Sequence, residues 1–383
     1  MKNLGLVIIC LLLFSCQPKN IKFGTEGGID VNLDILRGVE IHTSDLFKSA
    51  HTIILETKPE CIVGNVDDIL VFEREFYLLD KKGKSLFVFD MNGKFIRRIG
   101  KLGRGPGEYL YIFDFTIDPL NREIYVLDNG EKIHKYTVEG TYIKSIQIDP
   151  NAKLPYFTSI QFFDGKIYAA PNQLRNTEDH LLYVIAPATG EILSGHLSMK
   201  DNMEWNLPVM NSVFFNRLHG VPKFVYPNMN KILSLDDNTP LMTFESKNFL
   251  LVTEIEEIKK QFPRLSSAMR LKILQGIYNY METEDLIFLC YFLNNKKEII
   301  IYRKDEQNIY LANPFLNDLV YEKVNTIDIK CTDEKGAYEV VSMAQFDLYR
   351  NLILDNIDKR EQLLDLKIED ANPVIFFYEF KDR

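Results

Sequence analysis

The sequence lacks the short motifs that carry common catalytic and metal chemistry. It contains no HExxH, no GxSxG and no DxDxDG-type calcium loop. Its six histidines never stand at metal-ligand spacing. The single tryptophan, Trp205, argues against WD40 repeats, whose signature includes a tryptophan. No metal site and no cofactor are therefore predicted.

Cysteine is also scarce. Of the five cysteines, Cys10 lies in a predicted signal peptide and Cys16 follows it, which leaves Cys61, Cys290 and Cys331. An odd and widely scattered set is not a disulfide framework, and no CxxC pair suggests zinc. One disulfide among the three remains open. Burial as small apolar side chains is the favoured interpretation for Cys290 and Cys331, which lie in apolar runs.

Positive charge is in deficit. Lys and Arg number 45 against 54 Asp and Glu, a net charge of −9. This balance argues against nucleic acid, whose phosphates favour basic patches. It argues equally against broad electrostatic docking on anionic lipid. No nucleic-acid partner is predicted.

A hydrophobic run long enough to cross a bilayer is missing from the N-terminus. The apolar run from Leu4 to Phe14 is too short and fits the central region of a signal peptide over residues 1–15. The segment Leu13-Phe14-Ser15-Cys16 resembles a bacterial lipobox, in which the cysteine receives lipid. A plain signal peptide with an unrelated cysteine is the alternative. Residues 16–44 are predicted to form a tether and an N-terminal segment.

The sequence does contain a repeat. Three apolar segments recur in the same order, first as Phe76–Asp80, Leu86–Asp90 and Phe95–Ile99, then as Ile124–Asp128, Ile133–Tyr136 and Tyr142–Ile146. The offset is about 47 residues, which is typical of repeat architectures. Each copy consists of short strands separated by turn residues, so the repeating unit is an antiparallel sheet.

The turns extend the repeat along the chain. They fall at Asn92-Gly93, Glu139-Gly140, Thr189-Gly190 and, more weakly, Asp237-Asn238. Six units fit the length, with helical insertions at about 253–275 and 343–366. We predict an all-β, six-bladed β-propeller over residues 45–383. The strand Ala50–Glu56 is expected to pair with Pro373–Phe380 and close the ring.

A glycine-rich segment, Gly100–Tyr109, stands between the first two units. As a phosphate loop it fails, because a strand follows it and Pro106 removes a backbone N–H. The order Ile99-Gly100, then Gly103-Arg104-Gly105-Pro106-Gly107-Glu108-Tyr109, after an Asp-x-Asn-Gly-Lys hairpin, resembles the six-bladed β-propeller lipoproteins of Bacteroidetes, distant relatives of NHL-repeat propellers. The resemblance implies a propeller in the cell envelope and lends little on activity. Since surface export in that family goes with an acidic run after the lipidated cysteine, which is missing here, it favours the periplasmic side of the outer membrane.

Five polar residues are candidates for ligand binding at the mouth of the central channel. Arg104 and Glu108 lie in the connection between two blades, and Asn65, Asp67 and Asp114 stand near the start of inner strands. The alternative is that the glycines build a tight crossover held by an Arg104–Glu108 pair, and that the other three solvate the channel. A catalytic pair such as Glu108 with Asp114 stays open.

Two further acids, Asp80 and Asp128, end equivalent strands of the repeat and are interpreted as turn caps.

The sequence favours a lipid-anchored, non-catalytic binding module for a glycan, a peptide or an envelope protein, attached to the outer membrane through Cys16. A hydrolase or lyase acting on a sugar-like ligand at the channel mouth is the alternative, since propellers host both. A third possibility is a structural subunit whose helical insertions form the interface.

Overall fold

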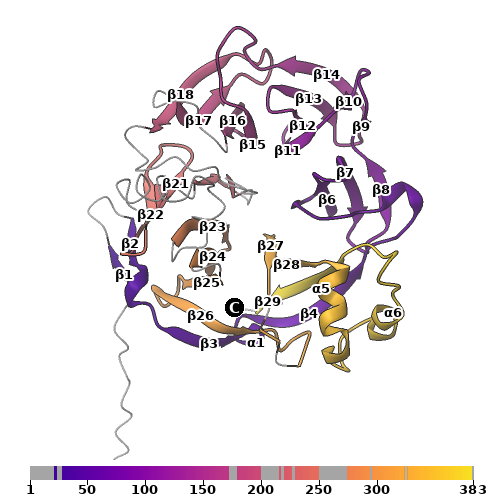
Figure 1. The fold of residues 1–383 in the computed structure, drawn as a ribbon, viewed down its shortest axis with the longest axis vertical. Helices are drawn as coiled ribbons and strands as arrows, with labels where there is room; N and C mark the ends of the chain where they lie inside the picture. Colours follow the sequence, from indigo (N-terminus) through magenta and orange to yellow (C-terminus); the bar gives the residue numbers. More distant parts are fainter. Residues whose placement is uncertain are drawn as a thin grey trace, which may run out of the picture.

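The computed structural model describes residues 21–23, 28–171, 179–199, 215–216, 220–226, 229–249, 274–293, 296–322, 324–325 and 327–381. Six sheets, here called blades 1 to 6 in chain order, surround a common centre (Figure 1). The prediction of a six-bladed β-propeller is therefore confirmed.

Blades 1 to 3 are four-stranded meanders whose strands follow the chain from the inside to the outside of the ring. Blade 1 contains β5 (Asp68–Phe72), β6 (Glu75–Asp80), β7 (Ser85–Asp90) and β8 (Phe95–Arg98). Blade 2 contains β11 (Ile112–Asp118), β12 (Glu123–Asp128), β13 (Lys132–Thr137) and β14 (Tyr142–Gln147). Blade 3 contains β15 (Phe157–Phe163), β16 (Lys166–Pro171), β17 (His180–Ile185) and β18 (Ile192–Ser198).

Blades 4 to 6 combine later strands with strands from the N-terminal segment. Blade 4 contains β19 (Phe215–Asn216), β20 (Lys223–Val225), β21 (Lys231–Ser234) and β22 (Pro240–Glu245), followed by β2 (Ile29–Asn32) and β1 (Ile21–Phe23). Blade 5 contains β23 (Leu274–Glu282), β24 (Leu286–Leu293), β25 (Lys296–Arg303), β26 (Asn308–Leu316) and β3 (Gly38–His42). Blade 6 contains β27 (Ile329–Thr332), β28 (Gly336–Val341), β29 (Val374–Phe380) and β4 (Phe47–Ile54).

The burial of each strand follows from its place in the blade. The middle strands β6, β7 and β12 are buried at five of six positions, because both faces of a blade pack against neighbouring blades. The outermost strand β14 alternates between exposed and less exposed side chains over most of its length. Six hydrophobic clusters form the core, one between each pair of neighbouring blades.

The segment before residue 45 does more than tether the protein. Strand β2 pairs in parallel with β22, and β3 pairs in parallel with β26. A 3-10 helix (Leu33–Ile35) connects β2 to β3, and the short helix α1 (Thr43–Leu46) follows β3. The chain therefore follows the outer edges of blades 4 and 5 before it enters blade 6, and it covers edges that would otherwise expose unpaired backbone groups. Sequence reasoning missed these two strands.

The predicted closure of the ring is confirmed. Strand β4 pairs antiparallel with β29, with Ile53 opposite Ile375. The buried Asn372 amide strengthens this closure: it donates to the carbonyls of Glu56 and Cys61, each at 2.8 Å, and accepts from the N–H of Val63 at 2.8 Å. A 3-10 helix (Pro59–Cys61) lies in the same connection.

The second predicted helical insertion lies between β28 and β29. It contains α5 (Met343–Tyr349), a 3-10 helix (Arg350–Leu352) and α6 (Arg360–Leu364), and it packs on the outside of blade 6 (Figure 1). Most of the first predicted insertion, residues 253–273, lies outside the described residues, and β23 begins at Leu274.

Candidate functional site

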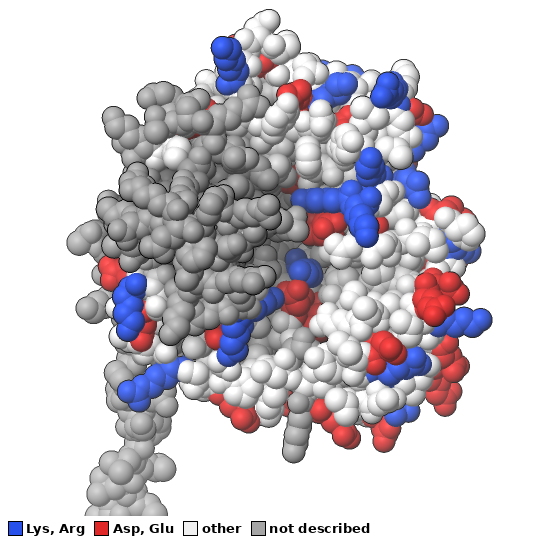
Figure 2. Space-filling model, in the orientation of Figure 1, with Lys and Arg blue, Asp and Glu red and all other residues white. Residues whose placement is uncertain are grey.

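The two faces of the ring differ in which loops they carry. Because successive strands of a blade run in opposite directions, the connections between blades and the turns between second and third strands share one face, here called the connection face. The remaining turns lie on the opposite face. Figure 2 shows one face of the ring, on which basic and acidic side chains lie next to one another around its centre.

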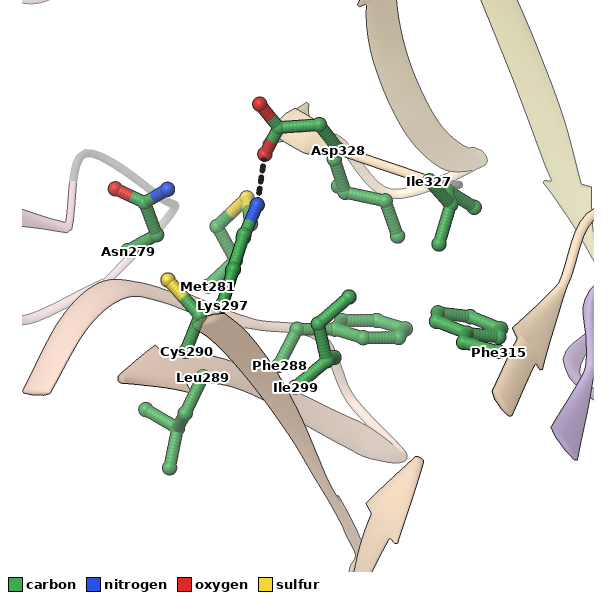
Figure 3. A pocket seen from close by; sticks show the side chains of 11 residues that line it. Asn279, Met281, Phe288, Leu289, Cys290, Lys297, Ile299, Phe315, Ile327 and Asp328 are labelled. Atoms are coloured by element: carbon green, nitrogen blue, oxygen red, sulfur yellow. Dashed lines mark hydrogen bonds and ion pairs between the residues drawn. The ribbon is translucent and has the colours of Figure 1, made fainter. Parts of the chain in front are cut away.

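A pocket lies between blades 5 and 6 (Figure 3). Its cavity volume is about 20 Å³, far below the roughly 300 to 1,000 Å³ of a site that encloses a small molecule. One end is polar and contains Asn279, Lys297 and Asp328; the other is formed by the rings of Phe288 and Phe315. The pocket can therefore receive a single small group of a larger ligand, with hydrogen-bonding side chains on one side and aromatic rings on the other.

An ion-pair cluster defines the polar end. The Asp328 carboxylate bonds Lys297 Nζ at 2.6 Å and Lys330 Nζ at 2.8 Å. Burial alone would raise the pKa of Asp328, but the two ammonium groups outweigh burial and hold that pKa below its usual value. Burial acts to lower the pKa of Lys297, yet Asp328 keeps that pKa above its usual value. Both groups are therefore charged near neutral pH.

Asn279 adds backbone strain to this end. It lies in β23, where the pairing with β24 is interrupted between Tyr278 and Met281, and its φ is +49°. Left-handed backbone at a residue other than glycine is uncommon and concentrates at functional sites. In Figure 3 its amide lies beside the Lys297–Asp328 pair.

A buried acid lies behind the cluster. Glu339 is 1% exposed and accepts hydrogen bonds from the Asp328 N–H at 3.0 Å and the Tyr378 hydroxyl at 2.6 Å. The Asn317 amide donates to the Tyr378 oxygen at 2.6 Å. Burial raises the pKa of Glu339 to about 7, although the Tyr378 hydrogen bond acts against that rise. Sequence reasoning missed Glu339. The signal that could have found it is its place as the single acid in the otherwise apolar strand Gly336–Val341.

The glycine-rich loop lies away from the centre of the ring. It contains the short parallel strands β9 (Lys101–Leu102) and β10 (Glu108–Tyr109), which lie toward the outside between β8 and β14 (Figure 1). The expected position of Arg104 and Glu108 at the channel mouth is therefore wrong. Whether they bind a ligand stays a prediction.

Glu108 holds this loop together, but not through Arg104. Its carboxylate accepts from the Gly105 N–H at 2.8 Å and pairs with Lys101 at 3.1 Å. The Gly105 N–H, and then Lys101, lower the pKa of Glu108. A Cβ at Gly103 would lie 1.9 Å from the Glu108 carboxylate, so this approach requires glycine. Arg104 is exposed and forms no ion pair within the described part of the chain.

Asn65 and Asp67 do lie together, directly before the innermost strand β5. The Asn65 amide donates to Asp67 Oδ1 at 2.9 Å, and the Lys81 N–H donates to Asp67 Oδ2 at 2.7 Å. Asp67 therefore joins the connection into blade 1 to the turn between β6 and β7.

Asp114 is buried on β11 and connects two blades. Its Oδ2 accepts from the Ser159 hydroxyl at 2.9 Å and from the Ile160 N–H at 2.7 Å, both on β15 of blade 3. Glu108 lies in the outer glycine-rich loop and Asp114 on the innermost strand of blade 2, and whether the two form a catalytic pair stays a prediction.

The turn-cap interpretation is confirmed for Asp80, whose carboxylate bonds the turn after its strand, whereas the Asp128 carboxylate bonds the connection that precedes its blade. Asp80 accepts from the N–H groups of Gly64 and Gly83 at 2.7 and 2.6 Å. Asp128 accepts from the Tyr111 N–H at 2.9 Å and contacts His134 at 3.1 Å. Each acid thereby ties a connection between blades to the end of a second strand, at equivalent positions of the repeat.

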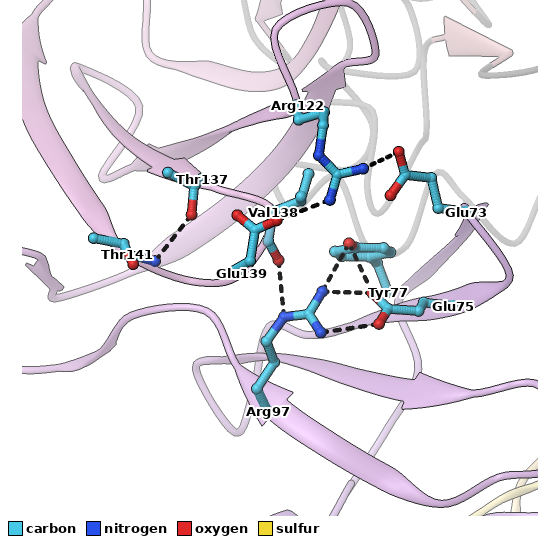
Figure 4. Close-up of polar contacts among 9 residues, drawn as sticks. All are labelled: Glu73, Glu75, Tyr77, Arg97, Arg122, Thr137, Val138, Glu139 and Thr141. Carbon is cyan, nitrogen blue, oxygen red and sulfur yellow. Dashed lines mark hydrogen bonds and ion pairs between the residues drawn. The ribbon is translucent and has the colours of Figure 1, made fainter.

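Sequence reasoning missed an ion-pair network between blades 1 and 2 on the opposite face (Figure 4). Arg97 on β8 donates to Glu75 of its own blade at 3.0 Å and to the Val138 carbonyl of blade 2 at 2.8 Å. Arg122 pairs with both Glu73 and Glu139. These pairs link the turns of adjacent blades, and no motif in the sequence marks them.

The three remaining cysteines are free. Burial raises the pKa of Cys290 to about 11, as expected of a thiol enclosed by apolar side chains. Within the described ranges, no group of three or more His, Cys, Asp or Glu is placed to hold a metal ion. No helix in those ranges is long and apolar enough to cross a membrane.

Comparison with known proteins places the chain in a family. Residues 27–379 match the family described as Domain of unknown function (DUF4934), and the chain belongs to it. No curated protein matches the sequence.

Two solved structures share the fold. A protein described as exported, from Bacteroides fragilis, is similar with a TM-score of 0.72 and 18% identity, covering 92% of this chain and 99% of that one. A DUF4221 family member from Bacteroides vulgatus is similar with a TM-score of 0.52 and 11% identity, covering 88% of this chain and 99% of that one. At these identities the likeness shows the fold alone.

Proposed function

We propose that this chain is a lipid-anchored, non-catalytic binding module of the cell envelope, held at the periplasmic side of the outer membrane. The lipobox-like segment ending in Cys16 supports the anchor. The similarity to a Bacteroides protein described as exported supports the location. A relationship to NHL-type propellers remains part of this proposal.

The observation that carries the proposal is the pocket between blades 5 and 6. It offers an amide, an ammonium group and a carboxylate at one end and aromatic rings at the other. Such a mixture suits a glycan or a peptide, which presents polar groups on an apolar frame. A protein partner would reach this site with a side chain.

The positions of the carboxylates favour binding over catalysis. Asp67, Asp114 and Glu108 all accept hydrogen bonds from backbone N–H groups of the ring itself. They hold loops and blades in place, whereas a general acid or base needs an oxygen that reaches the substrate.

Binding is tested with arrays of oligosaccharides and peptides probed with the full chain and with the double variant Lys297→Met/Asp328→Asn. We expect at least one array member to bind the wild type and to lose at least tenfold in affinity with the double variant. The matched control is Lys48→Met on β4, the outer strand of blade 6; it breaks the ion pair of Lys48 with Glu379 on β29 and should leave affinity unchanged. An array without any bound member would overturn the proposal.

Catalysis is tested in the same samples by mass spectrometry of the bound oligosaccharides. We expect their chain lengths to stay constant. Shortened products that disappear when Glu108 or Asp114 is changed would instead establish the hydrolase or lyase.

The anchor is tested by expressing Cys16→Ser beside the wild type. The wild type should fractionate with the outer membrane and resist protease added to intact cells, and the variant should be released. A variant that stays with the membrane would contradict lipidation at Cys16.

A further inference from the structure

Two exposed tyrosines are held by a single turn on the connection face. Tyr111 is 51% exposed and Tyr156 is 50% exposed. The Tyr111 carbonyl accepts from the Asn129 N–H at 2.9 Å, and the N–H after Tyr156 donates to the Gly130 carbonyl at 3.2 Å. The two tyrosines therefore flank the turn between β12 and β13, one on each side.

This turn fixes the tyrosines firmly. Asn129 and Gly130 have φ values of +53° and +68°, the backbone of a tight hairpin turn. A Cβ at Gly130 would lie 2.7 Å from the Phe157 carbonyl oxygen and 3.3 Å from the Tyr156 Cβ, so the close approach depends on glycine. Each tyrosine segment lies about one strand spacing, about 4.8 Å, from the turn. The backbones at Tyr111 and Tyr156 therefore lie on the order of 10 Å apart.

Positive charge lies next to Tyr111. The turn between β6 and β7 carries Lys81, Lys82 and Lys84, and Lys84 Nζ lies 4.2 Å from the centre of the Tyr111 ring. Lys81 and Lys82 form no ion pair within the described residues. The nearby acids on this face are Asp67 and Glu131, together with Asp80 and Asp128, which are buried and accept from the Gly83 and Tyr111 N–H groups.

The opposite face of the same two blades is different. There, Arg122 pairs with Glu73 and Glu139. Arg97 on β8 pairs with Glu75. Arg97 and Arg122 are thus neutralised by the protein, whereas Lys81, Lys82 and Lys84 form no ion pair among the described residues and remain available to a ligand.

We propose that Tyr111, Tyr156, Lys81, Lys82 and Lys84, here called the tyrosine–lysine surface, bind an anionic oligosaccharide that carries carboxylate or sulfate groups. The inference rests on the proposed binding function and names a ligand class for the connection face. A stiff sugar chain presents flat apolar ring faces to the tyrosines and regularly spaced anions to the lysines. An acidic peptide would satisfy the lysines without needing two fixed aromatic rings.

The test is isothermal titration of the full chain with four probes. Hexagalacturonate supplies carboxylates, a heparin-derived hexasaccharide supplies sulfates, maltohexaose is the neutral sugar and hexaglutamate is the acidic peptide. We expect one or both anionic oligosaccharides to bind, more weakly as salt is raised, and to exceed maltohexaose and hexaglutamate at least tenfold in affinity.

Variants locate the binding. Tyr111→Ala/Tyr156→Ala and, separately, Lys84→Gln should each weaken the anionic oligosaccharide at least tenfold. Leu120→Ala and Lys166→Gln, exposed positions on the opposite face, are matched controls and should change the affinity less than twofold. Melting temperatures of all variants establish that they fold.

Three outcomes would overturn the inference: no binding of either anionic oligosaccharide, equal binding by the tyrosine variants, or hexaglutamate binding as tightly as the sugars. If array ligands still bind and depend on Lys297 and Asp328, the proposed function stands and only the tyrosine–lysine surface is wrong.

Discussion

The Asp114 carboxylate of blade 2 accepts a hydrogen bond from the Ser159 hydroxyl of blade 3 at 2.9 Å, and both side chains are buried. The same oxygen also accepts from the Ile160 N–H at 2.7 Å. A residue expected to face the channel ligand therefore joins two inner strands.

This contact predicts an effect on stability. Asp114→Asn removes the charge and can place an N–H₂ group against the Ile160 N–H, so we expect a loss of about 2 to 3 kcal/mol in the free energy of unfolding. Ser159→Ala removes a single donor and should cost about 1 kcal/mol. Urea titrations of both variants and the double variant measure the coupling. Additive losses would show that the two side chains do not interact.

The raised pKa of Glu339 predicts that the free energy of unfolding depends on pH. Its pKa is raised from 4.5 to about 7 in the folded protein, so between these values the folded state keeps a proton that the unfolded state releases. The stability contribution is therefore full below pH 4.5 and falls as pH rises to about 7, by on the order of 3 kcal/mol. Unfolding free energies of wild type and Glu339→Gln, compared from pH 4 to 8, measure this. A difference that is constant with pH would contradict the raised pKa.

The repeat itself made much of the fold predictable. The strands from Phe76 to Ile146 recur because blades 1 and 2 bury the same middle strands and end their second strands with the same acid, Asp80 and Asp128. Ring closure was predictable because Ala50–Glu56 was a strand without a partner in its own unit.

The strands β2 and β3 could not be predicted in the same way. They add to outer edges that already end complete blades, so no unit of the repeat lacks a strand at that point. Their parallel pairing joins residues about 200 or more positions apart in the sequence, which no local pattern reveals.

The site was predicted least well. The glycine loop was expected at the channel mouth because connections between blades cross toward the centre, but its glycines pack against Tyr136 and Tyr142 on the outer part of blade 2. Lys297 and Asp328 come from different blades, and the pair exists only once those blades pack together.

The network in Figure 4 predicts that two arginines differ in their contribution to stability. Arg97 is mostly buried, with 20% side-chain exposure, and joins Glu75 to the Val138 carbonyl. Arg97→Gln should therefore cost about 2 kcal/mol, because it leaves Glu75 without its charged partner. Arg122→Gln is the control: this residue is exposed, so water and salt screen its two ion pairs and the variant should lose clearly less stability than Arg97→Gln. Equal losses for both variants would contradict this ranking.

Asn372 is expected to stabilise the closure of the ring. Its amide makes three hydrogen bonds of 2.8 Å to backbone groups of the connection from blade 6 to blade 1. Asn372→Ala leaves two carbonyls and one N–H without partners at a buried position, so we expect a loss of about 2 to 4 kcal/mol. Asn372→Asp separates geometry from hydrogen bonding: it keeps the acceptor toward the Val63 N–H but turns an oxygen toward the carbonyls of Glu56 and Cys61. It should therefore be at least as destabilising as alanine.

Hydrogen exchange should locate the damage in β4 and β29, whose amides should exchange faster than those of β12. If both variants exchange uniformly across all blades, Asn372 does not act at the closure.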